Sequence, residues 1–188
     1  MATGVEIAGP RIRLRELAEG DAPGLERVYG DRDVTRHLTF PPRSPEQCAD
    51  VVGSAMSHAA AEPRTIYLLA AVDGTDTLIG VGRLGIDEHP HSGQIGFVLR
   101  ADTRGRGVGG ELVRLLLRLG FEELGLSRIW GARSPENAAS QRVMAGAGMV
   151  EEGRIRRHVR SWGAWRDSVV HAILDDEWQP EAPSDVRG

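Results

Sequence analysis

The chain has 188 residues, the length of one domain, and a hydrophobic share of 40% lets it bury a core without disulfide bonds. Its formal net charge of −4 argues against nucleic acid as the main partner, and its single cysteine, Cys48, excludes a disulfide framework. No signal-peptide pattern and no apolar run long enough for a membrane span is present, so we expect a cytoplasmic protein without membrane association. We expect one domain over residues 1–179 and a disordered tail over 180–188.

The first 60 residues predict a strand and two helices. Residues 11–15 alternate with a period of two, which predicts a strand. A short helix follows Asp21, which we expect to cap it. A longer helix follows Ser44, because Ser44-Pro45-Glu46-Gln47 is a capping box with proline at the first helical position. Cys48 lies on the apolar face of this second helix, where we expect a buried, inert thiol.

The remaining chain alternates strands and helices. Three strands are predicted at residues 65–72, 78–87 and 93–100. An amphipathic helix over 111–124 follows, then a strand over 128–133, a short helix over 137–147, and two closing strands at about 150–159 and 165–174. Hairpins in the first part and a βαβ crossover in the second predict an α/β fold with a mixed sheet.

A glycine-rich segment joins the third of these strands to the amphipathic helix, with the sequence Arg104-Gly105-Arg106-Gly107-Val108-Gly109-Gly110. The first N–H groups of a helix have no partner within it and carry the positive end of its dipole, so they favour an anion. Each glycine costs about 1 kcal/mol relative to alanine within a helix. Four glycines in six residues therefore indicate that a phosphate approaches the main chain, although a simple turn is the plainer interpretation.

Three phosphate-binding patterns compete for this segment. A P-loop requires a lysine, and all 23 side chains counted as Lys or Arg are arginine, so the P-loop is excluded. Gly105-x-Gly107-x-x-Gly110 matches the dinucleotide fingerprint. However, five residues separate it from the preceding strand, and the acidic residue expected about 20 positions later is missing. A nicotinamide-dependent enzyme therefore stays as a less favoured alternative.

The third pattern is (Gln or Arg)-x-x-Gly-x-(Gly or Ala), which Arg104 to Gly109 satisfies. It resembles the coenzyme A pyrophosphate loop of the GNAT superfamily of N-acetyltransferases. Residues 134–149 are similar to the Asn-x-x-Ser helix and closing turn of its branch that acetylates ribosomal-protein N termini. Further similar segments lie at residues 11–16, 33–38 and 167–174, so the resemblance spans about residues 10–178.

The resemblance implies a single acetyltransferase domain with a mixed, mostly antiparallel sheet flanked by helices. The sheet would be splayed between its fourth and fifth strands, residues 94–100 and 128–133. It implies transfer of an acetyl group from acetyl-CoA to a primary amine, by direct attack on the thioester and without a metal. The acceptor is a protein N terminus or a small molecule, and the chain is a monomer or a homodimer.

The resemblance also implies where coenzyme A binds. The expected positions are Val98, Leu99, Arg104, Gly105, Arg106, Gly107, Val108, Gly109, Gly110, Asn137 and Ser140. The N–H of Val98 would stabilise the oxyanion, Asn137 would bind pantetheine, and Ser140 would protonate the leaving thiolate. Asn137 is alternatively a helix cap, since asparagine favours that position.

The general base is the weakest part of the resemblance. Many relatives carry a glutamate where this chain has Gln94, and a neutral amide cannot accept the proton. The nearby turn offers Asp87, Glu88, His89 and His91 as substitutes, or the amine loses its proton to water. The missing glutamate keeps a non-catalytic coenzyme A sensor as the first alternative. A basic run over residues 154–160 reads as a solvated hairpin rather than a nucleic-acid surface.

Overall fold

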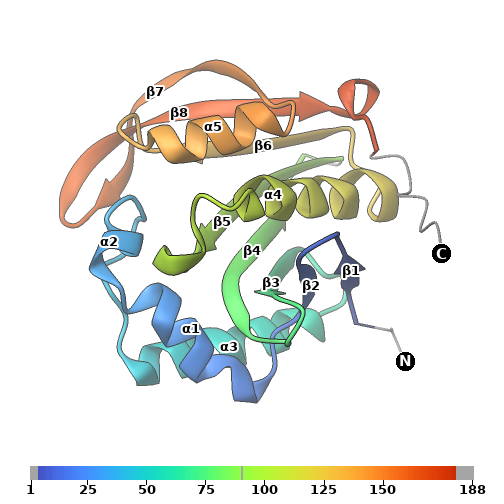
Figure 1. Ribbon diagram of the computed structural model, residues 1–188. Helices are drawn as coiled ribbons and strands as arrows, with labels where there is room; N and C mark the ends of the chain where they lie inside the picture. The colour runs from blue at the N-terminus through green and yellow to red at the C-terminus, as the bar shows by residue number, and fades with distance from the viewer. Residues whose placement is uncertain (1–3, 90, 181–188) are drawn as a thin grey trace.

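The computed structural model describes residues 4–89 and 91–180, and within them eight strands form one sheet in the order β1-β2-β3-β4-β5-β6-β8-β7 (Figure 1). Neighbouring strands are antiparallel, except β5 and β6, which are parallel. The sheet is therefore mixed and mostly antiparallel, as predicted.

The bounds of the strands are β1 Glu6–Ala8, β2 Arg13–Glu16, β3 Ile66–Val72, β4 Leu78–Ile86, β5 Ser92–Leu99, β6 Arg128–Arg133, β7 Val150–Ser161 and β8 Ala164–Leu174. The α-helices are α1 Ala22–Tyr29, α2 Arg32–Thr35, α3 Pro45–Ala59, α4 Val108–Arg118 and α5 Ala138–Gly146. Short helical turns occur at Glu19–Asp21, Ala101–Thr103, Leu119–Glu123 and Asp175–Glu177.

Most predicted elements agree with these bounds to within two or three residues. The strand β1 was not predicted, because its three residues are too few to show a period. Asp21 is the N-cap residue of α1, as predicted, but its side chain does not cap the helix: its carboxylate accepts the N–H of Ala18 and pairs with Arg15 at 2.7 Å. The tail predicted over residues 180–188 lies outside the described residues beyond Pro180.

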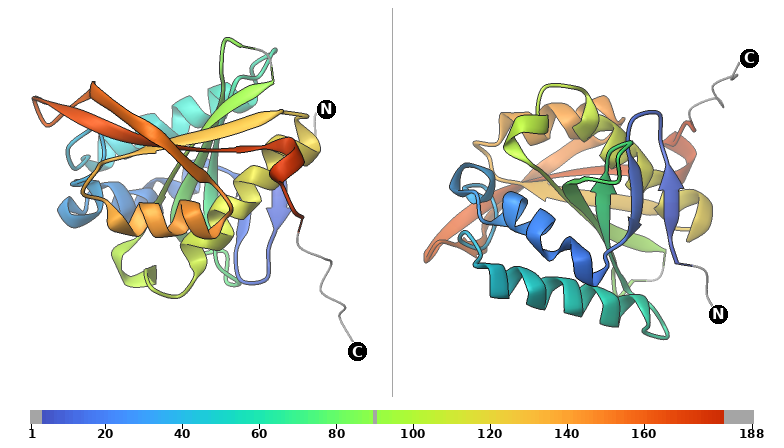
Figure 2. Two further views of the ribbon diagram at one scale, coloured as in Figure 1. Left: turned by 90° about the horizontal axis from the view of Figure 1, so that it is seen from above. Right: turned by 60° about the horizontal axis from the view of Figure 1, so that its bottom comes forward.

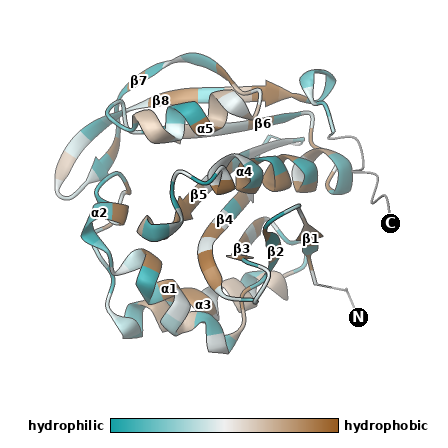
Figure 3. Ribbon diagram, in the orientation of Figure 1, coloured by the Kyte–Doolittle hydropathy of each residue, from teal (hydrophilic) through white to brown (hydrophobic). Residues whose placement is uncertain are grey.

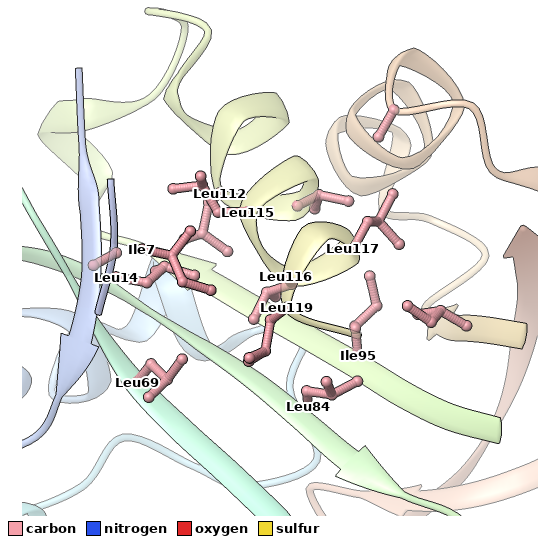
Figure 4. Packing of buried hydrophobic residues seen from close by; sticks show 14 of the residues in the cluster. Ile7, Leu14, Leu69, Leu84, Ile95, Leu112, Leu115, Leu116, Leu117 and Leu119 are labelled. Atoms are coloured by element: carbon pink, nitrogen blue, oxygen red, sulfur yellow. The ribbon is translucent and has the colours of Figure 1, made fainter. Parts of the chain in front are cut away.

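Helices cover both faces of the sheet (Figure 2). On one face, α4 packs its leucines against Leu14, Leu69 and Leu84 of the strands (Figure 4). On the other face, α1 and α3 cover a second cluster that includes the fully buried Cys48, as expected. Successive strand residues alternate between the two clusters, since side chains along a strand point to opposite faces. Figure 3 shows the resulting concentration of hydrophobic residues on β4 and α4.

The sheet opens between β5 and β6. These strands pair only over Ser92–Ile95 and Arg128–Gly131. Beyond that point β5 continues to Leu99 beside β4, whereas β6 continues to Arg133 beside β8. The two halves of the sheet therefore part after Ile95, in the predicted place, and leave one edge of β5 without a neighbouring strand.

Candidate active site

The register of β4 and β5 decides which backbone groups face the opening. At one end the N–H of Asp87 donates to Ser92, and at the other the N–H of Arg100 donates to Ile79. Hydrogen-bonded pairs recur at every second residue of an antiparallel ladder, so the register gives Val98 such a pair with Val81. The N–H and C=O of Val98 therefore point at β4.

This register corrects the predicted oxyanion donor. Because the N–H of Val98 faces β4, it is turned away from the opening. The backbone groups of Phe97 and Leu99 point the other way, toward the space that β6 has left. Phe97 is the nearer of the two to Ile95, where the strands part. The alternation of side chains along a strand does not show which residues of β5 direct their N–H and C=O groups toward β4. The sequence therefore could not reveal which N–H faces the opening.

The glycine-rich segment ends at the start of α4, directly beside this open edge. Gly105 and Gly107 both have a φ of 77°, a left-handed conformation that glycine adopts without the cost of a Cβ. Gly107 is the N-cap residue of α4, and no side chain caps the helix there. The first N–H groups of α4 are therefore left without an intrahelical or side-chain partner.

The glycines of this segment are needed for different reasons. A Cβ on Gly109 would lie 3.1 Å from Val143 of α5, so Gly109 lets the two helices approach. A Cβ on Gly107 would lie 3.0 Å from the guanidinium of Arg11. A Cβ on Gly110 would meet nothing within 4 Å, although Gly110 lines the pocket described next. Packing thus explains Gly109, whereas no protein atom explains Gly110.

Two residues that the motif search did not single out fix this segment to the N-terminal hairpin. Glu111 of α4 accepts the N–H groups of Arg11 and Ile12 at 2.7 and 2.9 Å, and its carboxylate pairs with the Arg11 guanidinium. Arg11 in turn donates to the carbonyl of Arg106. These contacts tie the middle of the glycine-rich segment and the first turn of α4 to the N-terminal hairpin.

A cavity of about 680 Å³, which we call the β5 pocket, brings most of the predicted positions together. From the predicted set it is lined by Val98, Leu99, Arg104, Gly105, Gly107, Gly109, Gly110, Asn137 and Ser140. Arg106 and Val108 do not line it, since Arg106 is exposed and Val108 is buried in the core beneath α4. The pocket also reaches α2, where Arg36 and His37 border it.

Asn137 and Ser140 begin helix α5 on the far wall of the β5 pocket. The side-chain oxygen of Asn137 accepts the N–H of Ser140 at 3.0 Å, so Asn137 is the helix cap that the alternative interpretation foresaw. Its amide N–H₂ has no partner among the described residues and stays available to a ligand. Ser140 is half-buried at the pocket wall.

A buried arginine holds the loop before α5. Arg133 is 6% exposed and donates to the carbonyls of Ser134 and Pro135 at 3.2 and 3.1 Å. Its Nε donates to His171 on β8 at 3.1 Å, and its guanidinium pairs with Glu151 on β7. Burial, reinforced by Arg133, lowers the pKa of His171, which keeps that imidazole a neutral acceptor. This network fixes the carbonyls that precede the pocket wall.

His37 is the titratable imidazole of the β5 pocket. Its Nε2 accepts a hydrogen bond from Arg36 at 3.1 Å. Burial lowers the pKa of His37, and Arg36 and Arg166 act in the same direction, whereas Glu136 opposes them. The ring is therefore neutral at pH 7, and it can accept a proton at Nε2 once that atom releases the Arg36 donor.

The four substitutes proposed for the missing glutamate lie at the closed end of the sheet. Asp87, Glu88, His89 and His91 belong to the turn between β4 and β5, which neither cavity reaches. Ser92, the first residue of β5, is six residues from Val98, or about 20 Å along an extended strand. Asp87 is moreover engaged by Trp130 and Ser92 at 2.8 and 2.7 Å. Distance thus excludes this turn as the base.

Comparison with known proteins identifies the family. The family model described as "Acetyltransferase (GNAT) domain" matches residues 11–150 of the chain. The chain belongs to the GNAT family of acetyltransferases. It is an N-acetyltransferase that depends on an acyl-CoA, as its family and relatives show. The mostly antiparallel sheet flanked by helices is thus the family's fold seen in this chain.

Two relatives carry the name of N-acetyltransferases. The chain is 27% identical over 169 residues to the uncharacterized N-acetyltransferase p20 of Bacillus licheniformis, a match that covers 89% of this chain and 95% of that protein. It is 35% identical over 88 residues to the uncharacterized N-acetyltransferase YnaD of Bacillus subtilis, a match that spans about half of each chain, 47% and 52%.

A solved structure resembles the whole chain. The ribosomal-protein-S5-alanine acetyltransferase from Vibrio fischeri has a TM-score of 0.76 and 25% identity, with 94% of this chain and all of that chain covered. Within the part of the chain that the structure describes, no helix is long and apolar enough to cross a membrane. Nor do the described residues contain a group of three or more potential metal-binding side chains.

Proposed function

We propose that the β5 pocket binds acetyl-CoA and that the chain transfers its acetyl group to a primary amine, which attacks the thioester directly. The carrying observation is the juxtaposition of two unsatisfied backbone surfaces, the uncapped start of α4 and the free edge of β5. The first suits a diphosphate, and the second suits the amide groups of pantetheine, which can pair with it as a strand does.

The walls of the pocket supply the remaining contacts. We assign the N–H groups of residues 108–110 to the diphosphate, with Arg104 and Arg142 beside them as further cations. Leu99 and Phe97 would bond pantetheine, and the N–H of Phe97, close to where the strands part, would stabilise the oxyanion. The amide of Asn137 would bind pantetheine, and Ser140 would protonate the leaving thiolate.

We assign the proton acceptor to His37 instead of the turn after β4. It borders the same pocket as Val98, and its lowered pKa leaves it neutral at pH 7. Because the pKa is lowered, the protonated, inactive form accumulates only as the pH falls below the ordinary value of 6.5. The wild-type rate should therefore be flat above pH 7 and decline in acid, and His37→Gln should lower the rate about a hundredfold and abolish this decline.

The function is tested by calorimetric titration with coenzyme A and by release of free thiol from acetyl-CoA with a panel of amines and peptides. Micromolar binding of coenzyme A together with amine-dependent thiol release supports the proposal. Binding without thiol release for every acceptor would favour a sensor. Thermal protection by NADH but not by coenzyme A would favour a nicotinamide enzyme.

The acceptor is an amine on a protein N terminus or on a small molecule. The protein N terminus is favoured by the Vibrio fischeri relative, whose printed name specifies the alanine of ribosomal protein S5. A mass shift of one acetyl group at the α-amine of peptides, and none at the amines of small molecules, would support this choice. The reverse result would contradict it.

A further inference from the structure

A second cavity of about 320 Å³ lies on the other face of the sheet, between α3 and strands β3 and β4. We call it the α3 pocket; its wall includes Arg43, Asp50, Ser54, His58, Leu68 and Arg83. No role has been given to these residues above. Figure 2 shows α3 running across this face of the strands.

Two arginines line the α3 pocket. Some arginines elsewhere pair with carboxylates, as Arg15 does with Asp21 and Arg64 with Glu16, whereas others among the described residues, such as Arg36 and Arg104, do not. Among residues 4–89 and 91–180, no carboxylate lies within ion-pair distance of Arg43 or Arg83. Two half-buried guanidinium groups thus line one cavity without a paired carboxylate.

The Arg43 guanidinium lies close to two aromatic rings. Arg43 stacks 4.3 Å above the ring of Phe40 and 5.7 Å from that of Tyr29. Burial raises the pKa of Tyr29 to about 12, and the positive charges of both Arg43 and Arg83 oppose that rise. Asp50 is an exposed carboxylate at the rim and His58 is half-buried, so the two arginines leave the pocket positive.

The register connects the α3 pocket to the reaction centre. Arg83 lies directly opposite Gly96 on β5, and Gly96 is two residues from Val98. All three residues face the α3 side, because a Cβ on the neighbouring Gly82 would meet Leu112 and Leu116 of α4 on the other side. A Cβ on Gly96 would meet nothing within 4 Å, so the face between Arg83 and Val98 is open.

The position of the Arg83 guanidinium sets a distance. Its terminal nitrogens lie 2.9 and 3.0 Å from where a Cβ on Gly85 would be, and Gly85 is opposite Gln94. At about 3.3 Å per residue, Gly96 is about 3 Å and Gln94 about 10 Å from Phe97 along the strand, and β4 lies about 5 Å to the side of β5. An anion held by Arg83 would therefore lie about 6–11 Å from the backbone of Phe97, where the thioester would bind.

We propose that Arg83 and Arg43 bind a carboxylate of the acceptor, so that the substrate class is an amine whose molecule carries a carboxylate about 6–11 Å from the amine nitrogen. This inference rests on the proposed function, because it deepens the acceptor side of the same site. Arginine suits the role, since its planar donors bind a carboxylate through two parallel hydrogen bonds. A free α-amino acid is too short to span this distance.

A peptide and a small molecule can each carry such an amine and carboxylate, and a panel of acceptors distinguishes the two. Tetrapeptide amides with glutamate at position two, three or four are compared with the same peptides carrying glutamine. Aminohexanoate and its amide provide the same comparison in a small molecule. For the wild type we expect kcat/KM to favour the acid over its amide at least tenfold, mostly through KM, for peptides with glutamate at position three or four or for aminohexanoate. The member of the panel with the largest ratio identifies the source.

The variants assign the preference to these arginines. Arg83→Gln should reduce the acid-to-amide ratio to about one, Arg43→Gln should reduce it severalfold, and Arg83→Lys should leave an intermediate ratio. Arg118→Gln is the matched control, since Arg118 is an exposed arginine of α4 paired with Glu122 and lines neither pocket. Calorimetric binding of coenzyme A shows that each variant is folded.

A binding measurement separates this inference from the proposed function. The N-acetylated forms of the same peptides are titrated into the protein in the presence of coenzyme A. Acid-selective binding that Arg83→Gln abolishes would support the carboxylate site even if no amine is acetylated. Equal rates for acids and amides throughout, with acetylation intact, would overturn the carboxylate site and leave the proposed function standing.

Discussion

Helices α3 and α4 begin in opposite ways. At α3, the Ser44 hydroxyl accepts the N–H of Gln47 at 3.3 Å, and the Gln47 side chain accepts the N–H of Ser44 at 3.0 Å. At α4, the N-cap is Gly107 and no side chain caps the helix. The first helix satisfies its own backbone, whereas the second leaves its N–H groups for something else. The contrast locates an anion site within a single chain, without reference to another protein.

The largest expected effect is a loss of stability at the start of α5, which begins in a third way. Asn137 caps this helix, and Arg133 holds the preceding carbonyls from beneath. Arg133→Gln should lower the free energy of unfolding by about 3 kcal/mol, because buried acceptors lose a charged donor. Urea denaturation measures the loss. Arg154→Gln, which removes an exposed pair with Asp167, should cost under about 1 kcal/mol, and an equal loss would contradict the buried network.

Replacing Gly107, the N-cap residue of α4, tests the difference between the starts of α3 and α4 most directly. Gly107→Val must place a β-branched side chain at φ 77° and against Arg11. We expect a loss in affinity for coenzyme A of about a hundredfold, or 2.7 kcal/mol, since the turn can no longer aim its N–H groups. Calorimetric titration measures this. Undiminished affinity would mean that the anion binds elsewhere.

A milder change at Gly110 separates binding from folding. A Cβ there meets no protein atom but enters the pocket wall, so Gly110→Ala should weaken coenzyme A binding about tenfold. Alanine in a helix should at the same time stabilise the fold by up to about 1 kcal/mol. Gly53→Ala on α3, where a Cβ also meets nothing, is the control and should stabilise without affecting binding. A fall in thermal stability at Gly110→Ala would point to packing instead.

The smallest expected effect lies at the capped helix. Ser44→Ala should cost about 1 kcal/mol of stability, because the N–H of Gln47 loses its partner. Affinity for coenzyme A should stay unchanged, because Ser44 does not line the β5 pocket. Thermal unfolding and calorimetry on the same sample check both statements. A change in affinity would show that the two helix starts are coupled.

The sequence revealed these helix starts because their signals are local. The capping box at Ser44 and the glycine run after Arg104 need no distant residue to be recognised. The alternating and heptad-like apolar patterns likewise located the strands and α4, whose leucines form the core of one face. The family resemblance added the place of the splay, which local patterns do not encode.

The incorrect predictions, in contrast, concern features that no local signal encodes. Each depends on the register of two strands or on a residue that is distant in the sequence. The expected oxyanion donor, Val98, depends on which residues of β5 form hydrogen-bonded pairs with β4, and the bonds of Asp87 and Arg100 at the two ends of the ladder fix this. The turn after β4 does not supply the general base, because it lies at the end of β5 that pairs with β6 and is far from the open part of the strand. Asp21 was expected to cap α1 because aspartate favours the N-cap, whereas its pairing with Arg15 shows only in the folded backbone.

The short joint between β5 and β6 has a mechanical consequence. Four residue pairs, from Ser92 with Arg128 to Ile95 with Gly131, connect the two halves of the sheet along this seam. A ligand lying along the rest of β5 would act as a removable ninth strand and bridge the halves. Amide hydrogen exchange at Phe97 and Leu99 would then slow when the cosubstrate binds. The bound cosubstrate would stabilise the junction between β5 and β6, and its release would destabilise that junction.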